Sequence, residues 1–239
     1  MGLFDLPGPL FAAIDRAMAM ALSPAWRLAC WAALAGAGTL MLYKLMSPQQ
    51  RIGQAKRAAR EARQRLNAFD GELSEAGPLI RAQFVAAFRH LGLVIPGTLL
   101  SILPLLALLV WLDGHYARSY PVASEAPVVT TSPRHLESRW VKLGDEPPRV
   151  QVSRGGELLA EVLVSSPVPI VEHRHWWNWL FANPLGYLPA DSGIERIEIA
   201  FPEREYLAYG PGWMRSWLTI FFPVMLVVSL LMFRWAKVQ

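Results

Sequence analysis

The sequence predicts a helical integral membrane protein with three transmembrane helices, a cytoplasmic helical hairpin and a β-rich extracytoplasmic domain between spans 2 and 3. The chain of 239 residues is 53% hydrophobic and only 18% charged, whereas a typical soluble domain is about 25% charged. Residues 28–43, 91–112 and 216–233 contain no Asp, Glu, Lys or Arg. Each stretch approaches the roughly 20 apolar residues that a helix needs to cross a bilayer. No sustained alternation of polar and apolar residues indicates an outer-membrane barrel.

The composition also limits the functions that the chain can perform. The formal net charge is +4, and Cys30 is the single cysteine, which excludes an intrachain disulfide and a cysteine-based metal cage. The sequence contains no nucleophile elbow, P-loop, dinucleotide-binding glycine motif or metalloprotease helix motif. We therefore expect no enzyme activity, no catalytic residue, no cofactor, no metal and no DNA partner.

The segment 1–23 is predicted to be an amphipathic helix in the external membrane interface. Its apolar residues recur at helical spacing, and Asp15 and Arg16 lie off the apolar face. Because the segment is too short to span, a helix lying in the membrane plane is favoured. Span 1 follows over 25–46, with Arg27 and Lys44 near its two ends.

Residues 47–90 are predicted to form a coiled-coil hairpin. The first helix has apolar residues spaced three and four apart, which is typical of a narrow coiled-coil seam. The seam consists of Ile52, Ala55, Ala59, Ala62, Leu66, Phe69 and Leu73. The second helix carries an apolar face made of Ile80, Phe84, Ala87, Phe88 and Leu91. We expect this face to pack against the seam in an antiparallel pair.

Spans 2 and 3 are predicted over 91–112 and 211–233, and the β-rich domain over 113–210. Within that domain, 149–153, 157–164 and 194–199 are predicted strands. The first two flank a Gly-Gly turn. The part of the domain before residue 149 is rich in proline and is predicted to be irregular.

The basic residues predict the orientation of the chain in the membrane. The segment 47–92 carries eight Lys and Arg residues, and the tail 234–239 carries Arg234 and Lys237. Short basic loops stay in the cytoplasm, whereas a long loop is translocated whatever its charge. The hairpin and the tail are therefore predicted to be cytoplasmic, with the N-terminus outside. The predicted location is the inner (plasma) membrane, as a multi-pass protein in contact with the lipid bilayer.

The junction between span 1 and the hairpin has a distinctive sequence. Residues 42–51 read Leu-Tyr-Lys-Leu-Met-Ser-Pro-Gln-Gln-Arg, and the beginning of span 2 follows over 84–112. Together with the order of the elements, these stretches resemble the YidC/Oxa superfamily of membrane-protein insertases, above all its small three-span archaeal and endoplasmic reticulum members. The similarity covers residues 5–112 and 213–235. Members of this superfamily work through a hydrophilic groove that is open to the cytoplasm and to lipid.

The resemblance implies a client-binding groove between the three spans. Lys44 corresponds by position to the basic side chain of the family groove. The other predicted lining residues are Thr39, Tyr43, Thr98, Ser101, Thr219 and Ser229. The basic face of the hairpin is the implied first contact with a client or a ribosome. That face consists of Arg51, Lys56, Arg57, Arg60, Arg63 and Arg65. Without the resemblance, Lys44 is an ordinary boundary lysine and the hairpin cations are solvated or contact anionic lipid.

The predicted outer domain contains an unusual aromatic cluster. It consists of Trp176, Trp177, Trp179 and Phe181. Trp side chains suit either a surface that contacts a partner or the membrane, or the core of a small domain. The nearby His173 and His175 lie on alternate positions, but the sequence places no third metal ligand beside them.

Three functions remain open from the sequence. The first is an insertase or membrane chaperone that shields polar segments of membrane-protein clients in the groove. The second is an accessory or assembly subunit of a larger membrane complex, without insertase activity. The third is a sensor that passes a signal from the outer domain to the hairpin, although the sequence lacks a long signalling helix.

Overall fold

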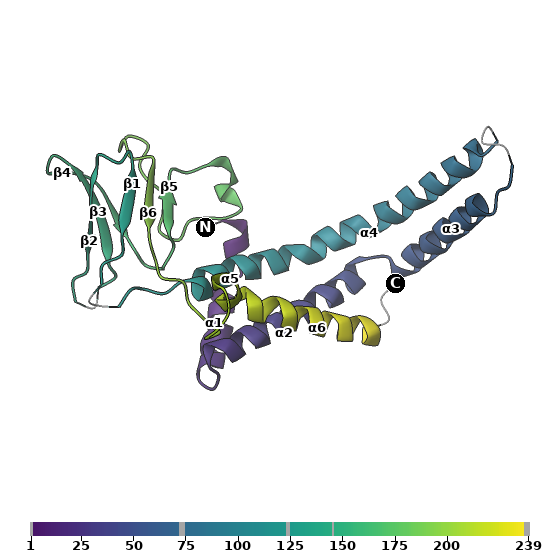
Figure 1. Ribbon diagram of the computed structural model, residues 1–239, viewed down its shortest axis with the longest axis horizontal. Coiled ribbons are helices and arrows are strands. Elements are labelled where there is room, and N and C mark those ends of the chain that lie inside the picture. The colour runs from purple at the N-terminus through teal and green to yellow at the C-terminus, as the bar shows by residue number, and fades with distance from the viewer. Residues whose placement is uncertain (1, 72–74, 123–124, 145, 237–239) are drawn as a thin grey trace. The chain divides into compact units, whose positions relative to one another are not determined.

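The computed structural model describes residues 2–71, 75–122, 125–144 and 146–236. The chain divides into two compact units. The strand unit comprises Met1–Leu28 and Leu106–Phe221, and the helical unit comprises Ala29–Leu105 and Phe222–Gln239. Three long helices contribute residues to both units (Figure 1).

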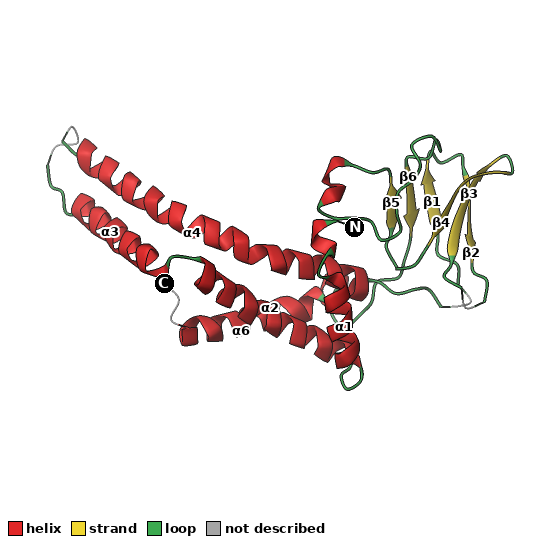
Figure 2. Cartoon of the chain, turned by 180° about the vertical axis from the view of Figure 1, so that it is seen from behind, coloured by secondary structure: helices red, strands yellow, loops and turns green. Residues whose placement is uncertain are grey.

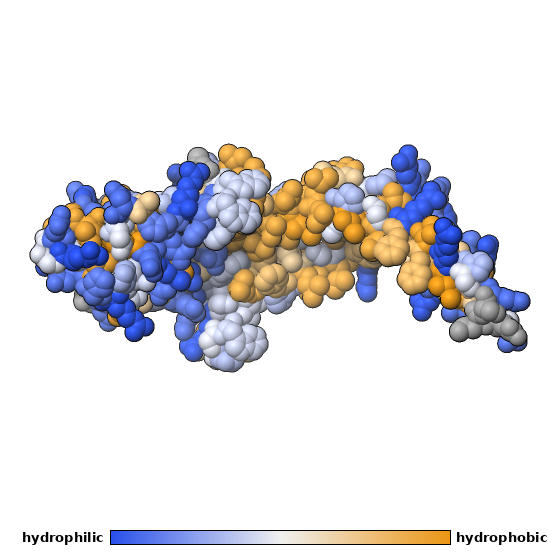
Figure 3. All heavy atoms as spheres, turned by 90° about the horizontal axis from the view of Figure 1, so that it is seen from above, coloured by the Kyte–Doolittle hydropathy of each residue, from blue (hydrophilic) through white to orange (hydrophobic). Residues whose placement is uncertain are grey.

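These three helices are the predicted spans. They are α2 (Pro24–Met46), α4 (Gly77–Leu112) and α6 (Leu218–Ala236). Each contains a segment that is long and apolar enough to cross a membrane, and among the described residues there are three such helices, the number that the sequence predicts. In the space-filling view, apolar side chains cover the middle part of the helices, whereas polar side chains cover most of the strands and much of the opposite, helical end (Figure 3).

The second hairpin helix and span 2 are one continuous helix. We expected a boundary near residue 91, but α4 runs through it and through Pro96 and Pro104. Its 36 residues correspond to about 54 Å at 1.5 Å per residue. A bilayer core is about 30 Å thick, so α4 is long enough to cross a membrane and extend well beyond it.

Span 3 begins later than we predicted. The short helix α5 (Gly212–Arg215) ends at Ser216, which has an extended backbone with φ −70° and ψ 162°. The Ser216 hydroxyl donates to the carbonyl of Trp213 at 3.1 Å. The continuous helix therefore starts at Leu218 rather than near residue 211.

The first hairpin helix, α3 (Gln49–Asn67), places its predicted seam on its inner face. Ile52 and Ala55 are buried at 1% and 6% exposure. The seam residues farther along are half-buried; they are Ala59, Ala62, Leu66 and Phe69. Leu73, the last predicted seam residue, lies outside the described part of the chain.

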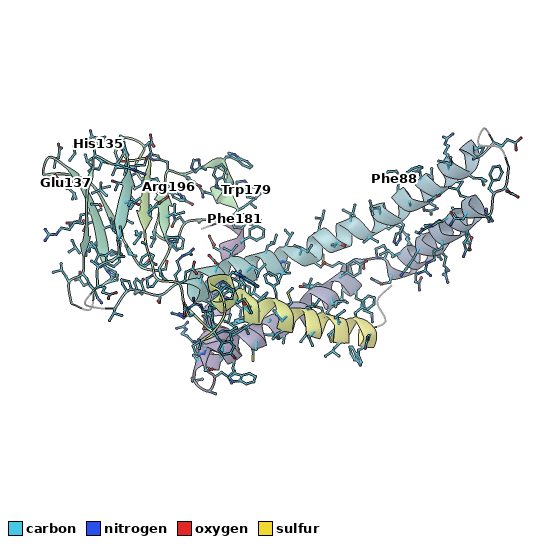
Figure 4. All side chains as sticks on the ribbon, in the orientation of Figure 1. Phe88, His135, Glu137, Trp179, Phe181 and Arg196 are labelled. Carbon is cyan, nitrogen blue, oxygen red and sulfur yellow. The ribbon has the colours of Figure 1, made fainter. Side chains whose placement is uncertain are left out.

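The predicted apolar face of the second hairpin helix does not pack against this seam. Phe84 and Phe88 are 59% and 67% exposed, and Ile80 and Leu91 are exposed as well. Phe88 points away from α3 (Figure 4), although α3 and α4 run side by side (Figure 2). The α4 side chains that line the cleft toward α3 are Ala82, Val85, Ala86, Arg89 and Leu93. Arg51, Gln54, Ala55 and Ala58 line the same cleft from α3, so the phenylalanines lie outside the region where the two helices face each other.

The strand unit contains two antiparallel three-stranded sheets. One has the order β1 (Val129–Ser132), β6 (Arg196–Ile199), β5 (Ile170–Glu172). The other has the order β2 (Glu137–Val141), β3 (Arg149–Arg154), β4 (Glu157–Leu163). The three predicted strands are confirmed as β3, β4 and β6. The prediction of an irregular first half was wrong, because β1 and β2 lie between its prolines.

The two sheets share one hydrophobic core. Its fully buried residues include Val150 and Val152 of β3 and Ile197 and Ile199 of β6. The alternation of these residues with more exposed ones places every second side chain on the inner face. Gly155 and Gly156, with φ of +58° and +87°, form the tight turn between β3 and β4. The domain is therefore a small two-sheet sandwich.

Besides α5, the strand unit contains four other short elements. They are η1 (Leu3–Asp5), α1 (Gly8–Ala19), the π-helical turn η2 (Asp113–Ala117) and η3 (Trp176–Trp179). The helix α1 occupies the segment that we predicted to be an amphipathic interfacial helix.

Candidate functional site: a hydroxyl-lined groove between three helices

A groove of about 380 Å³ opens between α2, α4 and α6 in the helical unit. Its lining residues are Gly36, Thr39, Leu40, Tyr43, Thr98, Ser101, Ile102 and Ser229. Five of these eight residues carry hydroxyl groups. Because all of them belong to the helical unit, the groove is a feature of that unit alone.

Gly36 sets the spacing between α2 and α6. A Cβ atom at this position would lie 2.7 Å from the carbonyl oxygen of Met225 and 2.9 Å from Oγ of Ser229. No side chain larger than hydrogen fits there without movement of α6. Gly38, two residues along the same helix, faces open space. The close approach at Gly36 brings the Ser229 hydroxyl to the groove.

Gly97 likewise sets the spacing between α4 and the end of α2. A Cβ atom on Gly97 would lie 2.8 Å from Cβ of Ser47. Ser47 is buried, its hydroxyl donates to the carbonyl of Tyr43, and it accepts a hydrogen bond from the side-chain amide of Gln49. This arrangement fixes the end of α2 and places Tyr43 beside the groove.

The hydroxyl groups on α4 donate their hydrogens to their own helix. Thr98 Oγ1 donates to the carbonyl of Val94 at 3.0 Å, and Ser101 Oγ donates to the carbonyl of Gly97 at 2.8 Å. A hydroxyl has one donor and two acceptor sites, so each oxygen keeps acceptor capacity. Ser101 is only 2% exposed, whereas Thr98 is half-buried. Of these two hydroxyl groups, it is therefore that of Thr98 that can accept a hydrogen bond from a bound segment or from water.

The groove lies near the C-terminal end of α2. Thr39 and Tyr43 occupy the last two turns of α2, which ends at Met46. Thr39 is seven residues from that end, or about 10 Å along the helix axis. The groove therefore opens close to the point where the chain passes from α2 into α3.

The structure brings together five of the seven predicted groove residues and leaves out two. Lys44 is exposed on the last turn of α2 and does not line the groove, although Leu40, one turn earlier, does. Thr219 belongs to the strand unit, and its hydroxyl donates to the carbonyl of Trp213 at 3.3 Å. Lys44 therefore stands beyond the lining rather than inside it, and Thr219 is a local capping residue.

The basic residues of the hairpin lie on the outer surface of α3. Lys56 is half-buried, and the other five are exposed. Those five are Arg51, Arg57, Arg60, Arg63 and Arg65. Arg51 also lines a cleft of about 630 Å³ between α3 and α4, next to the seam residue Ala55.

The aromatic cluster of the strand unit is on the surface and not in the core. Trp176 is 78% exposed and Trp179 is 55% exposed. His173 Nδ1 lies 3.1 Å from the carbonyl of Leu188, whereas His175 stacks on Trp177 with ring centroids 4.4 Å apart. The two histidines thus have separate partners, and the described residues contain no group of three or more His, Cys, Asp or Glu placed to hold a metal ion.

The sequence predicts close packing against a neighbouring helix at Gly36 and Gly38, because glycines in an apolar helix allow close approach. The structure shows such a contact at Gly36 and none within 4 Å at Gly38. Gly97 is the glycine that sequence reasoning missed, although Gly97 and Ser101, four residues apart on α4, are the pair of small residues that marks a close helix contact.

The chain was also compared with known proteins. No protein-family model, no curated protein and no solved structure matches it.

Proposed function

We propose that this protein is a membrane-protein insertase or chaperone of the YidC/Oxa type, which shields polar client segments in the groove between its three spans. The observation that carries the proposal is the gathering of five hydroxyl-bearing residues from α2, α4 and α6 on one groove. A polar segment pays a large desolvation cost in lipid. Hydroxyl oxygens in an open groove offset part of that cost.

The helical hairpin supplies the approach to the groove in this proposal. Exposed arginines on α3 attract the phosphates of anionic lipids or ribosomal RNA. The exposed apolar face of α4, which includes Phe84 and Phe88, continues toward the part of the same helix that carries Thr98. A client would contact this face first and then move along α4 to the groove.

Lys44 has a boundary role in the proposal. The side chain is exposed on the last turn of α2, one residue after the groove residue Tyr43. A lysine at this position extends its ammonium group toward the membrane surface. There it keeps water near the open end of the groove and attracts acidic residues of a client.

The proposed location is the inner (plasma) membrane, with the hairpin and the C-terminal tail in the cytoplasm. The basic residues of α3 and Arg234 support this orientation through the positive-inside rule. The strand unit and the N-terminus are then outside the cytoplasm.

Site-specific photocrosslinking in cells tests the proposal. A photoreactive residue replaces Thr98, which lines the groove, and in a matched variant replaces the adjacent Leu99, which is 60% exposed and does not line it. A second matched pair is Tyr43 and Leu45. An insertase should give crosslinks to many short-lived nascent membrane proteins at Thr98 and Tyr43, and few at the two leucines.

The same experiment separates the alternatives. Thr98→Val and Ser229→Ala together remove two hydroxyl groups with little change in volume, and they should weaken the client crosslinks at Tyr43. Lys44→Ala should weaken them as well, and Lys44→Arg should restore them. A single stable crosslinked protein, unaffected by these variants, would refute the insertase and favour an accessory subunit of a larger complex. Equal crosslinking to lipid at all four positions would refute both.

A further inference from the structure

Hydrogen bonds and ring contacts within the turn hold the aromatic cluster in place. Asn178 holds it from within: the backbone N–H of His175 donates to Oδ1 of Asn178, and Nδ2 of Asn178 donates to the carbonyl of Phe181 at 3.1 Å. The rings also pack on one another, with the Trp176 and Trp177 centroids 5.8 Å apart. Residues 175–182, which we name the Trp turn, therefore present their aromatic side chains in a fixed arrangement.

The Trp turn is fastened to the N-terminal segment. The backbone N–H of Phe4 donates to the carbonyl of Leu180 at 3.0 Å, and the backbone N–H of Ala182 donates to the Asp5 carboxylate at 3.2 Å. The centres of the Phe4 and Phe181 rings lie 4.9 Å apart. The turn and residues 2–6 therefore form one surface.

Contacts of α1 link that surface to the ends of two predicted spans, α2 and α4. Two residues separate η1 from α1. In α1, the ring of Phe11 packs edge to face on the ring of Trp111 of α4, with ring centres 5.9 Å apart. Farther along α1, Asp15 pairs with Arg27 in the first turn of α2 at 2.6 Å. All of these residues belong to the strand unit. The position of α1 across the ends of α2 and α4 therefore determines the depth of the Trp turn.

The exposed side chains of this surface are those of a membrane interface. Apolar residues of the N-terminal segment and α1 extend the Trp turn; the exposed ones are Leu3, Leu6 and Leu10. Two other tryptophans next to the spans are also exposed: Trp26 in the first turn of α2 at 67%, and Trp213 in α5 at 75%. Tryptophan prefers the headgroup level of a bilayer, where its apolar ring is buried and its N–H is hydrated.

We propose that the Trp turn inserts into the headgroup region of the extracytoplasmic leaflet, so that lipid is the occupant of the exposed aromatic surface. The argument rests on the direct link from the turn through η1 and α1 to two membrane spans. It does not depend on the insertase proposal, because a complex subunit would need the same anchor.

Spin labelling of the full-length protein tests this inference. The single cysteine is replaced as Cys30→Ala, the protein is reconstituted in phosphatidylcholine and phosphatidylglycerol vesicles, and a spin label is attached at Trp176→Cys. A matched label at Leu158→Cys, on β4 and 55% exposed, is the control. The ratio of oxygen to nickel-chelate collisions should be several-fold higher at position 176 than at 158. A water-like ratio at 176 would overturn the proposal.

A second measurement leaves the aromatic surface largely intact. Lipids brominated near the carbonyl end of their chains quench tryptophan at the interface. Trp176→Phe, Trp177→Phe and Trp179→Phe together should remove a strongly quenched component of the fluorescence. Trp140→Phe changes a half-buried tryptophan in β2. This variant should remove a component of the fluorescence that the brominated lipids do not quench. If the Trp turn is water-exposed in pure lipid but shielded in native membranes, its occupant is a protein, and the lipid proposal fails.

Discussion

Arg27 and Asp15 form an ion pair of 2.6 Å that joins the first turn of α2 to α1. Both side chains are largely buried, at 16% and 15% exposure. The hydroxyl of Tyr116 donates to the other oxygen of the same carboxylate, and the Arg27 guanidinium lies 5.6 Å from the centre of the Tyr116 ring. One carboxylate therefore connects three elements, α1, α2 and η2.

Asp15→Asn should destabilise the protein by about 2 kcal/mol, because it leaves the buried Arg27 guanidinium without its counter-charge. Thermal unfolding in detergent, followed by near-ultraviolet circular dichroism, measures the change. Arg16→Ala, at the neighbouring exposed position, is the control and should leave the midpoint unchanged. An equal effect of both variants would contradict the assigned role of the ion pair.

Gly36→Ala should destabilise the helical unit by about 1–3 kcal/mol, because the new Cβ would collide with the α6 backbone at Met225. Gly38→Ala meets no atom within 4 Å, so it should be neutral or stabilising by up to about 1 kcal/mol. Both variants change the helix propensity equally, so the difference between them reports the contact of α2 with α6. Unfolding of the full-length protein in mild detergent measures both, and matching midpoints would argue against close packing at Gly36.

Ile197→Ala should cost about 3 kcal/mol, because it opens a cavity in the sandwich core, where Ile197 is fully buried. Leu158→Ala removes a side chain that is 55% exposed on β4, and its effect should stay within about 0.5 kcal/mol. Limited proteolysis of the strand unit in the full-length protein distinguishes them. If Leu158→Ala were cleaved faster than Ile197→Ala, the assignment of Ile197 to the hydrophobic core would be wrong.

Alkaline pH should destabilise the strand unit through Tyr206. Burial raises the pKa of Tyr206 above 10, and the nearby Arg204 opposes this only in part. The unfolded chain therefore ionises at lower pH than the folded protein, so stability is complete below pH 10 and falls as the pH rises through the raised pKa. Stability measured against pH should show this loss.

Tyr206→Phe should make that pH dependence shallower above pH 10, while Tyr116 and Tyr120, whose pKa values burial also raises, keep part of it. It should also cost about 1 kcal/mol at neutral pH, because the hydroxyl no longer donates to the carbonyl of Tyr116 at 2.9 Å. Tyr209→Phe, at a side chain that is 77% exposed, should follow the wild-type curve. A Tyr206→Phe curve as steep as the wild-type curve would assign the alkaline loss to other groups.

The spans and half of the strands could be predicted because their patterns are local. A charge-free stretch of about 20 residues identifies a membrane helix, and the Gly-Gly turn identifies the hairpin of β3 and β4. The strand β1 escaped prediction because its short β-branched run, Val129 to Thr131, lies between Pro127 and Pro133. Proline near a strand lowers the expectation of a strand, although edge positions tolerate it.

The packing of α4 could not be predicted from its own sequence. The apolar spacing of Phe84 and Phe88 is real, but a stripe does not show which neighbour covers it. The alanines at 82 and 86 line the cleft toward α3 instead.

The candidate groove was partly predictable for a geometric reason. Thr39 and Tyr43 are four residues apart, and Thr98 and Ser101 are three apart, so each pair shares one helix face. Lys44 follows Tyr43 by one residue, which turns it by about 100° around α2. Thr219 lies ten residues before Ser229, or about 15 Å along α6, so one groove could not include both.

The link between Asp5 and Ala182 also has a consequence for biosynthesis. These residues are 177 positions apart, and a chain grows at about 5–20 residues per second, so the second partner is made about 9–35 s after the first. During that interval the N-terminal segment has no sandwich to bind. The strand unit can therefore close only late in translation, once the Trp turn has been made.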